Sequence, residues 1–242
     1  MRARIKQFIS DTSLLLRSIP SPVITILVLS VVMMNLLANK TIYQKGFFAV
    51  DGGIVVSWAC FLCMDIITKH FGARAATQAS IFALAVNLFA VAIFAVVSLI
   101  PTETDYSAFN GIFGGSWFIV LSSSLAFISS AVANNALNAA IGGMFKKNPD
   151  GRAAYYTRSY VSTFIGQFID NMVFASLVFM VFAPIYWGGF SWTLPQCITC
   201  SLIGAVLELL MEVIFSPIGY RVTRRWKREN VGLAYLQAHA MT

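Results

Sequence analysis

The sequence has few charged residues for its length. Asp, Glu, Lys and Arg account for 11% of the 242 residues, whereas 58% are hydrophobic, and the mean hydropathy is +0.75. A soluble domain carries about 25% charged residues. Because so few polar side chains cannot cover a globular surface in water, we expect most of the chain to be surrounded by lipid.

Motifs of common enzyme chemistry are also missing. No nucleotide-binding loop of the form G-x-x-x-x-G-K-S/T occurs, so the chain is not expected to hydrolyse ATP itself. Its two histidines, His70 and His239, lie outside the centres of the apolar runs. Two C-x-x-C pairs lie inside apolar runs, which favours packing as small apolar side chains over zinc binding: Cys60, Cys63, Cys197 and Cys200. We therefore predict no enzyme activity, no cofactor and no metal.

The net charge of +7 does not indicate a nucleic-acid partner. The basic residues flank apolar runs and form no continuous patch, which is typical of membrane topology signals. The partners that we expect are instead the lipid bilayer and a small-molecule solute, and a homo-oligomer stays open.

Six apolar runs of 15–26 residues match or come close to the roughly 17–25 residues that a helix needs to cross a bilayer. The strands of a β-barrel would be short and alternating, so we predict an all-α integral membrane protein with six transmembrane helices. The first run begins after Pro20 and Pro22 and is long enough to span, so no cleavable signal peptide is expected. The runs are 23–37, 53–68, 76–100, 115–140, 160–182 and 194–215.

The basic residues predict the orientation of these helices. With the N-terminus in the cytoplasm, 15 of the 17 Lys and Arg residues fall on the inner side and only Lys40 and Lys45 on the outer side. This asymmetry follows the positive-inside rule and places both termini in the cytoplasm.

A single membrane domain is expected between two basic segments. We divide the chain into a cytoplasmic N-terminal segment 1–22, the transmembrane domain 23–220 and a basic cytoplasmic tail 221–242. Residues 1–20 carry apolar positions among the basic ones, as a helix on a membrane surface does. An unstructured tail is the alternative.

Asp170 is the most informative residue, because it lies in the middle of the apolar run 160–182. It is about 15 Å from the end of that helix, near the midplane of a hydrocarbon layer about 30 Å thick. An isolated carboxylate there is costly and usually functional. Gln167 lies one turn before it, and both are candidates for solute binding.

Two further runs place polar residues on one helical face. Ser123, Ser130, Asn134 and Asn138 recur at helical spacing in the fourth run, where they line either a solute pathway or a close helix contact. Glu208 lies one turn from Glu212 in the sixth run, and two like charges on one face favour protonation or ligand pairing. Asn134 and Glu208 are the candidates from these runs.

The first two runs supply three more candidates. Asn35 and Asn39 are four residues apart and are expected to share a helix face, with helix–helix hydrogen bonding as the alternative role. Asp65 precedes Lys69 by one helical turn, so a local ion pair is the alternative to a ligand role. Together these acids and amides, with no cation at depth, favour a neutral or cationic solute that is rich in N–H donors.

Four segments resemble the VUT family of bacterial six-span proteins, also called queuosine precursor transporters. They are NLLANK at 35–40, DIITKHFGARAA at 65–76, RSYVSTFIGQFIDNMVFASLVF at 158–179 and ELLMEVIFSPIGY at 208–220. The resemblance implies import of 7-deazaguanines across the bacterial inner membrane for queuosine modification of transfer RNA. Its motifs carry over to Asn35, Asp65, Gln167 and Asp170. The alternative is the substrate-binding subunit of an energy-coupling-factor vitamin importer, which needs separate ATPases.

Overall fold

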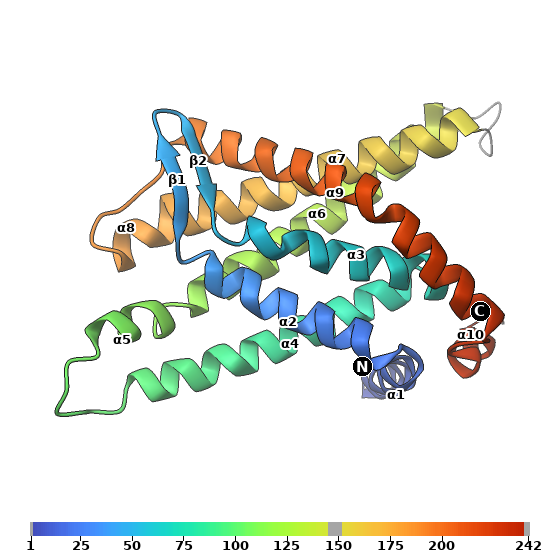
Figure 1. The fold of residues 1–242 in the computed structure, drawn as a ribbon, viewed down its shortest axis with the longest axis horizontal. Coiled ribbons are helices and arrows are strands. Elements are labelled where there is room, and N and C mark those ends of the chain that lie inside the picture. Colours follow the sequence, from blue (N-terminus) through green and yellow to red (C-terminus); the bar gives the residue numbers. More distant parts are fainter. Residues whose placement is uncertain (1, 145–151, 240–242) are drawn as a thin grey trace. The chain divides into compact units, whose positions relative to one another are not determined.

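The structure is a computed structural model that describes residues 2–144 and 152–239, and helices dominate it (Figure 1). The helices are α1 (Arg2–Ser18), α2 (Ser21–Leu37), α3 (Ile54–Phe71), α4 (Ala73–Ser98), α5 (Ser107–Phe113), α6 (Trp117–Met144), α7 (Arg152–Ala175), α8 (Ala183–Tyr186), α9 (Leu194–Arg228) and α10 (Leu233–His239). The π-helix η1 (Ser176–Phe182) joins α7 to α8. The strands β1 (Thr41–Lys45) and β2 (Phe48–Asp51) form an antiparallel hairpin.

The predicted all-α membrane class is confirmed. Within residues 2–144 and 152–239, five helical stretches are long and apolar enough to cross a membrane. A bent pair, Lys6–Ser18 with Ser21–Leu37, gives a sixth if the pair counts as one span. The five are Ile54–Phe71, Ala73–Ser98, Ser107–Ala133, Phe164–Tyr186 and Leu194–Phe215. Their orientation and the three-part division of the chain stay predictions.

Proline and glycine mark the breaks between these elements. Pro20 lies between α1 and α2, where its ring and missing N–H end the first helix and suit the start of the second. Gly72 has a φ of +92° between α3 and α4, a left-handed conformation that favours glycine. Gly46, with a φ of +58°, opens the two-residue turn of the hairpin.

The chain forms two compact units. The first comprises Met1–Met33, Val56–Phe89 and Glu212–Thr242, and the second comprises Met34–Val55 and Ala90–Met211. In the first unit, α10 contributes the buried Tyr235, whose hydroxyl donates to Gln78 Oε1 over 3.1 Å. In the second unit, Phe179 stacks on Trp192 with ring centroids 3.8 Å apart, within an apolar core shared by α6, η1 and α9.

Large apolar side chains also cover the outside of the helices. Phe89 is 67% exposed, Val96 63%, Ile128 58% and Val132 65%. A soluble protein rarely exposes so many large apolar residues on its helices. Facing lipid, these side chains need no protein partner, and this agrees with the membrane class.

The structure adds two features to the predicted elements. No strand was expected between the first two apolar runs, yet the hairpin occupies residues 41–51. The basic segment after residue 220 is helical, since α9 continues to Arg228 and α10 follows. Residues 2–18 are helical as well and are not an unstructured tail, while their position on the membrane surface stays a prediction.

Candidate functional site

Asp170 on α7 faces Ser130 on α6 within the second unit. The Ser130 hydroxyl lies 3.0 Å from Asp170 Oδ1 and 3.1 Å from the carbonyl oxygen of Phe127 in its own helix. Its single proton therefore serves two acceptors, and the carboxylate receives a neutral, shared donor. Across the described residues, no lysine or arginine forms a salt bridge with Asp170.

The neighbouring residue, Asn171, faces α9 instead. Consecutive helical residues point about 100° apart, so α7 presents Asp170 to one helix and Asn171 to another. The Asn171 Nδ2 group donates to Glu208 Oε2 over 3.5 Å, a long hydrogen bond. Glu208 is only 5% exposed. A polar layer formed by Ser130, Asp170, Asn171 and Glu208 thus runs through three helices of the second unit.

Gly204 makes room for this layer. It lies one turn before Glu208 on α9, and a β-carbon at this position would come within 2.6 Å of Asn171 Nδ2. Any side chain here would displace the amide from Glu208. Asn171 and Gly204 were not among the predicted site residues, because neither residue type stands out in an apolar run without its neighbour.

The surrounding sequence leaves the polar layer without nearby positive charge. No lysine, arginine or histidine occurs between Ser159 and Tyr220, a stretch that holds Asp170, Glu208 and Glu212. α6 carries no charged residue at all. An arrangement of acids and amides like this accepts hydrogen bonds and repels anions.

Asn35 and Asn39 lie in the second unit but not on one helix face. Asn35 is buried near the end of α2, whereas Asn39 lies two residues past that end, so the expected shared face is wrong for Asn39. The Asn39 amide donates to the Leu36 carbonyl over 3.0 Å and to Ser116 Oγ over 3.4 Å. Its observed contacts connect the end of α2 to the start of α6.

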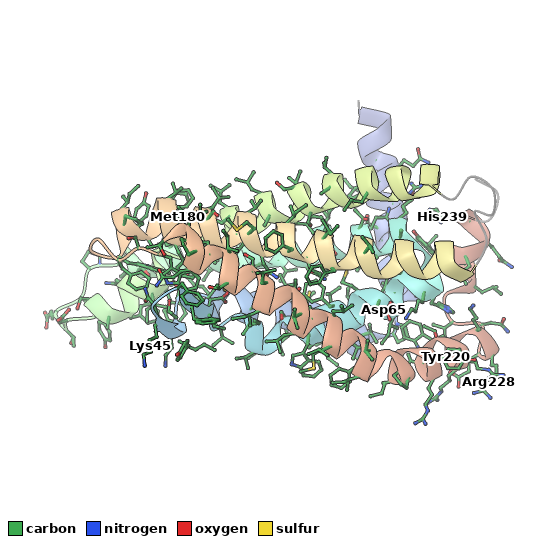
Figure 2. The ribbon with its side chains drawn as sticks, turned by 90° about the horizontal axis from the view of Figure 1, so that it is seen from above. Lys45, Asp65, Met180, Tyr220, Arg228 and His239 are labelled. Atoms are coloured by element: carbon green, nitrogen blue, oxygen red, sulfur yellow. The ribbon has the colours of Figure 1, made fainter. Side chains whose placement is uncertain are left out.

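Asp65 belongs to the first unit and forms the local ion pair that the sequence left open. Its Oδ2 lies 2.7 Å from Lys69 Nζ, and the two side chains are 22% and 43% exposed. Exposed i,i+4 pairs of this kind contribute roughly 0.3–0.5 kcal/mol. Figure 2 labels Asp65 on α3. A ligand role for Asp65 stays a prediction.

The roles predicted for Gln167 and Asn134 stay predictions. Gln167 is partly buried on α7, one turn before Asn171. Asn134 lies on α6, but its side chain falls outside the described part of the structure. The same holds for the side chains of Asn138 and Glu212.

Asp51 is an acidic residue that the sequence analysis missed. Its Oδ1 accepts the Gly53 N–H over 2.6 Å, and its Oδ2 lies 3.6 Å from Cys200 Sγ on α9. Desolvation by burial raises the pKa of the Asp51 carboxyl, although the Gly53 N–H works in the opposite direction. The Asp-Gly-Gly sequence after a short β-prone stretch is the signal that marks this turn.

The hairpin that carries Asp51 is fastened to the start of α9. Gln196 Nε2 donates to the Gly46 carbonyl over 2.9 Å, and Thr199 Oγ1 donates to the Phe47 carbonyl over 2.6 Å. These contacts hold the turn of the hairpin, while Cys200 reaches its far end. Asp51 is therefore held on both sides within the second unit.

We expect the Asp51→Asn variant to be more stable than the wild type, by an amount that grows as pH rises. Because the folded-state pKa is raised, wild-type stability is fully present below the unfolded pKa and falls as pH rises through the folded value. The amide keeps the acceptor for Gly53 but cannot ionise. Thermal unfolding in detergent from about pH 4 upward should show a gap of a few degrees that opens as pH rises above the unfolded pKa, since 1 kcal/mol is worth about 2–4 °C at this size. Parallel curves would contradict the assignment.

A multi-pass membrane protein with acids and amides layered between its helices has the features of a solute transporter. A family model described as "Putative vitamin uptake transporter" matches residues 51–222, and the chain belongs to this family. The family resemblance seen in the sequence is thereby confirmed, and the chain is a multi-pass membrane transporter. No curated protein and no solved structure matches the sequence significantly.

Proposed function

We propose that this transporter imports 7-deazaguanine precursors of queuosine across the inner membrane of a bacterium. The observation that carries the proposal is a pair of acids between the helices, the partly buried Asp170 and the buried Glu208, each in contact with a neutral donor from a neighbouring helix. The family supplies the transport function. The motifs at 35–40, 65–76, 158–179 and 208–220 supply the solute class.

The chemistry of the polar layer suits a guanine-like edge. Such an edge presents a ring N–H and an exocyclic amine side by side, and one carboxylate can accept both. A solute N–H can replace the shared Ser130 hydroxyl on Asp170 without uncovering a second buried charge. Displacing a lysine or arginine would leave that cation unpaired in a poorly hydrated site, at a much higher cost.

We assign the amine edge of the solute to Asp170 or Glu208. Asn35, Asn39 and Gln167 are candidates for the remaining hydrogen bonds, because an amide can serve the solute carbonyl. Asn171 joins this set as the partner of Glu208. Asp65 and Asn134 stay candidate site residues on the evidence of the sequence.

A ligand screen on the detergent-purified protein tests the solute class. We expect 7-deazaguanines, including 7-cyano-7-deazaguanine, 7-aminomethyl-7-deazaguanine and queuine, to raise the melting temperature. The matched control is 7-cyano-7-deazahypoxanthine, which lacks only the exocyclic amine of 7-cyano-7-deazaguanine and should bind at least tenfold more weakly than it does. A ligand at 100 times its Kd stabilises by about 2.7 kcal/mol, so binding is readily seen. Tight binding of biotin or another vitamin, with none of the deazaguanines, would overturn the proposal.

The second candidate function is the solute-capture subunit of an energy-coupling-factor importer, which the family description of vitamin uptake favours. Such a subunit captures solute but depends on separate ATPases for transport. We expect the purified chain alone in liposomes to take up labelled 7-aminomethyl-7-deazaguanine. Binding without uptake would favour the capture subunit.

A further inference from the structure

Helix α1 lies at a large angle to α2, the apolar helix that follows it. The axes of Lys6–Ser18 and Ser21–Leu37 differ by 114°. In Figure 1, α1 is seen almost along its axis while α2 lies near the plane of the picture. α2 exposes Ile26 and Leu29, at 47% and 55%, as a helix surrounded by lipid does. We take α2 as the part of this bent pair that crosses the membrane, and a helix that turns by 114° from it then lies along the membrane surface.

One face of α1 is used for packing. Leu15, and Ile19 just after the end of the helix, are buried in the core of the first unit. Asp11, the only acidic residue of α1, accepts a hydrogen bond from Arg74 Nη2 over 2.9 Å and lies 3.6 Å from His239 Nε2. The single negative charge of the helix is therefore held by contacts within the unit.

The opposite face is basic and exposed. Lys6, Ser10, Ser13 and Arg17 follow one another at helical spacing, and all four are exposed. Ile9, which is 61% exposed, lies at the edge of this row. The open surface along this row is formed by Lys6, Ile9, Ser10, Ser13, Leu14 and Arg17 of the same helix. We call this the α1 basic row.

We infer that the α1 basic row binds the headgroups of anionic phospholipids. A guanidinium and an ammonium are the side-chain groups that proteins use for phosphate, and serine hydroxyls add neutral donors between them. Ile9 places an apolar side chain where the glycerol and acyl region begins. No carboxylate on this face opposes the lipid phosphates, since Asp11 is held on the other side.

The size and position of the row select a lipid surface over a soluble anion. Lys6 and Arg17 are eleven residues apart, which is about 16 Å along a helix. A single phosphate ion cannot bridge that distance, whereas the phosphates of adjacent lipids form an extended surface. Only Ile19 and Pro20 separate α1 from the apolar helix α2, so the row stays at the depth of the headgroups.

The test compares lipid binding by the full-length protein and two matched variants. In the first, Lys6→Gln and Arg17→Gln remove both charges of the row. In the control, Lys227→Gln and Arg228→Gln remove two exposed charges from the end of α9 (Arg228 is labelled in Figure 2). Each basic residue near an anionic surface is worth about fivefold in affinity, so the row variant should bind phosphatidylglycerol roughly 25-fold more weakly. Native mass spectrometry of protein titrated with the lipid measures this.

Three outcomes decide the matter. Loss of phosphatidylglycerol binding in the row variant alone, with phosphatidylcholine binding unchanged, supports the inference. Equal losses of phosphatidylglycerol affinity in both variants would show that binding depends on the total charge of the protein and not on the α1 basic row. That result would overturn the inference. Binding of inorganic phosphate with the same dependence on Lys6 and Arg17 would also overturn it. The single variant Lys6→Gln, expected to lose about fivefold, replaces the double variant if the latter unfolds.

Discussion

Asp170→Asn is expected to reduce solute uptake more than 100-fold. The substitution keeps the shape of the side chain and the oxygen that accepts the Ser130 hydroxyl, so the fold should persist. It removes the charge and turns one acceptor into a donor, which would face the N–H groups of the solute. Each hydrogen bond to a charged group is worth about 1.5–3 kcal/mol, and losing two such bonds costs at least two decades in affinity.

The matched control for this prediction is Ser130→Ala. It removes the donor that occupies Asp170 in the absence of solute but leaves the carboxylate in place. We expect uptake to be retained, because the solute then replaces no bound hydroxyl. Both variants should be assayed for uptake of labelled 7-aminomethyl-7-deazaguanine in liposomes with equal protein content. Normal uptake by Asp170→Asn at limiting and saturating solute would remove Asp170 from the mechanism.

The apolar helices could be located from the sequence because lipid imposes a simple rule. A run that must satisfy its own backbone hydrogen bonds while facing hydrocarbon has to be long, apolar and helical. The prediction of 53–68 therefore falls within α3 and its preceding residue, and the prediction of 194–215 lies within α9. The end of α9 was harder to locate, because Pro217 and the basic residues after it signal a break that the helix does not make.

The pairing of polar residues depends on neighbours that are distant in the sequence. Spacing alone placed Asp170 at depth, but it could not show that Ser130 lies opposite, since 39 residues separate the two. The hairpin was not predicted, because long apolar runs dominate the pattern of the sequence, although Lys45-Gly46 between β-branched and aromatic residues is a turn signal. Asp51 was missed for the same reason, since its burial depends on the contact between the hairpin and α9.

Gly204→Ala is expected to lower solute affinity and uptake by disturbing the packing of the polar layer, while Asp170 and Glu208 stay in place. The new methyl group would lie 2.6 Å from Asn171 Nδ2, so the amide must rotate away from Glu208. A lost hydrogen bond to a charged partner costs about 1.5–3 kcal/mol, and we expect solute affinity and uptake to fall at least tenfold. Gly111→Ala is the control, because no atom lies within 4 Å of its added β-carbon.

The effect of Gly204→Ala on stability should depend on Asn171. We expect the substitution to be unfavourable in the wild type and stabilising in the Asn171→Ala protein. Alanine is favoured over glycine within a helix by about 0.8–1.0 kcal/mol, but in the wild type the clash with Asn171 opposes this gain. In the Asn171→Ala protein the clash is gone, so Gly204→Ala should then stabilise the fold without restoring uptake. A double-mutant cycle of melting temperatures measures the coupling energy between positions 204 and 171. For residues in contact this energy is about 0.5–3 kcal/mol. Equal effects of Gly204→Ala in both backgrounds would show that Asn171 does not occupy the space beside Gly204.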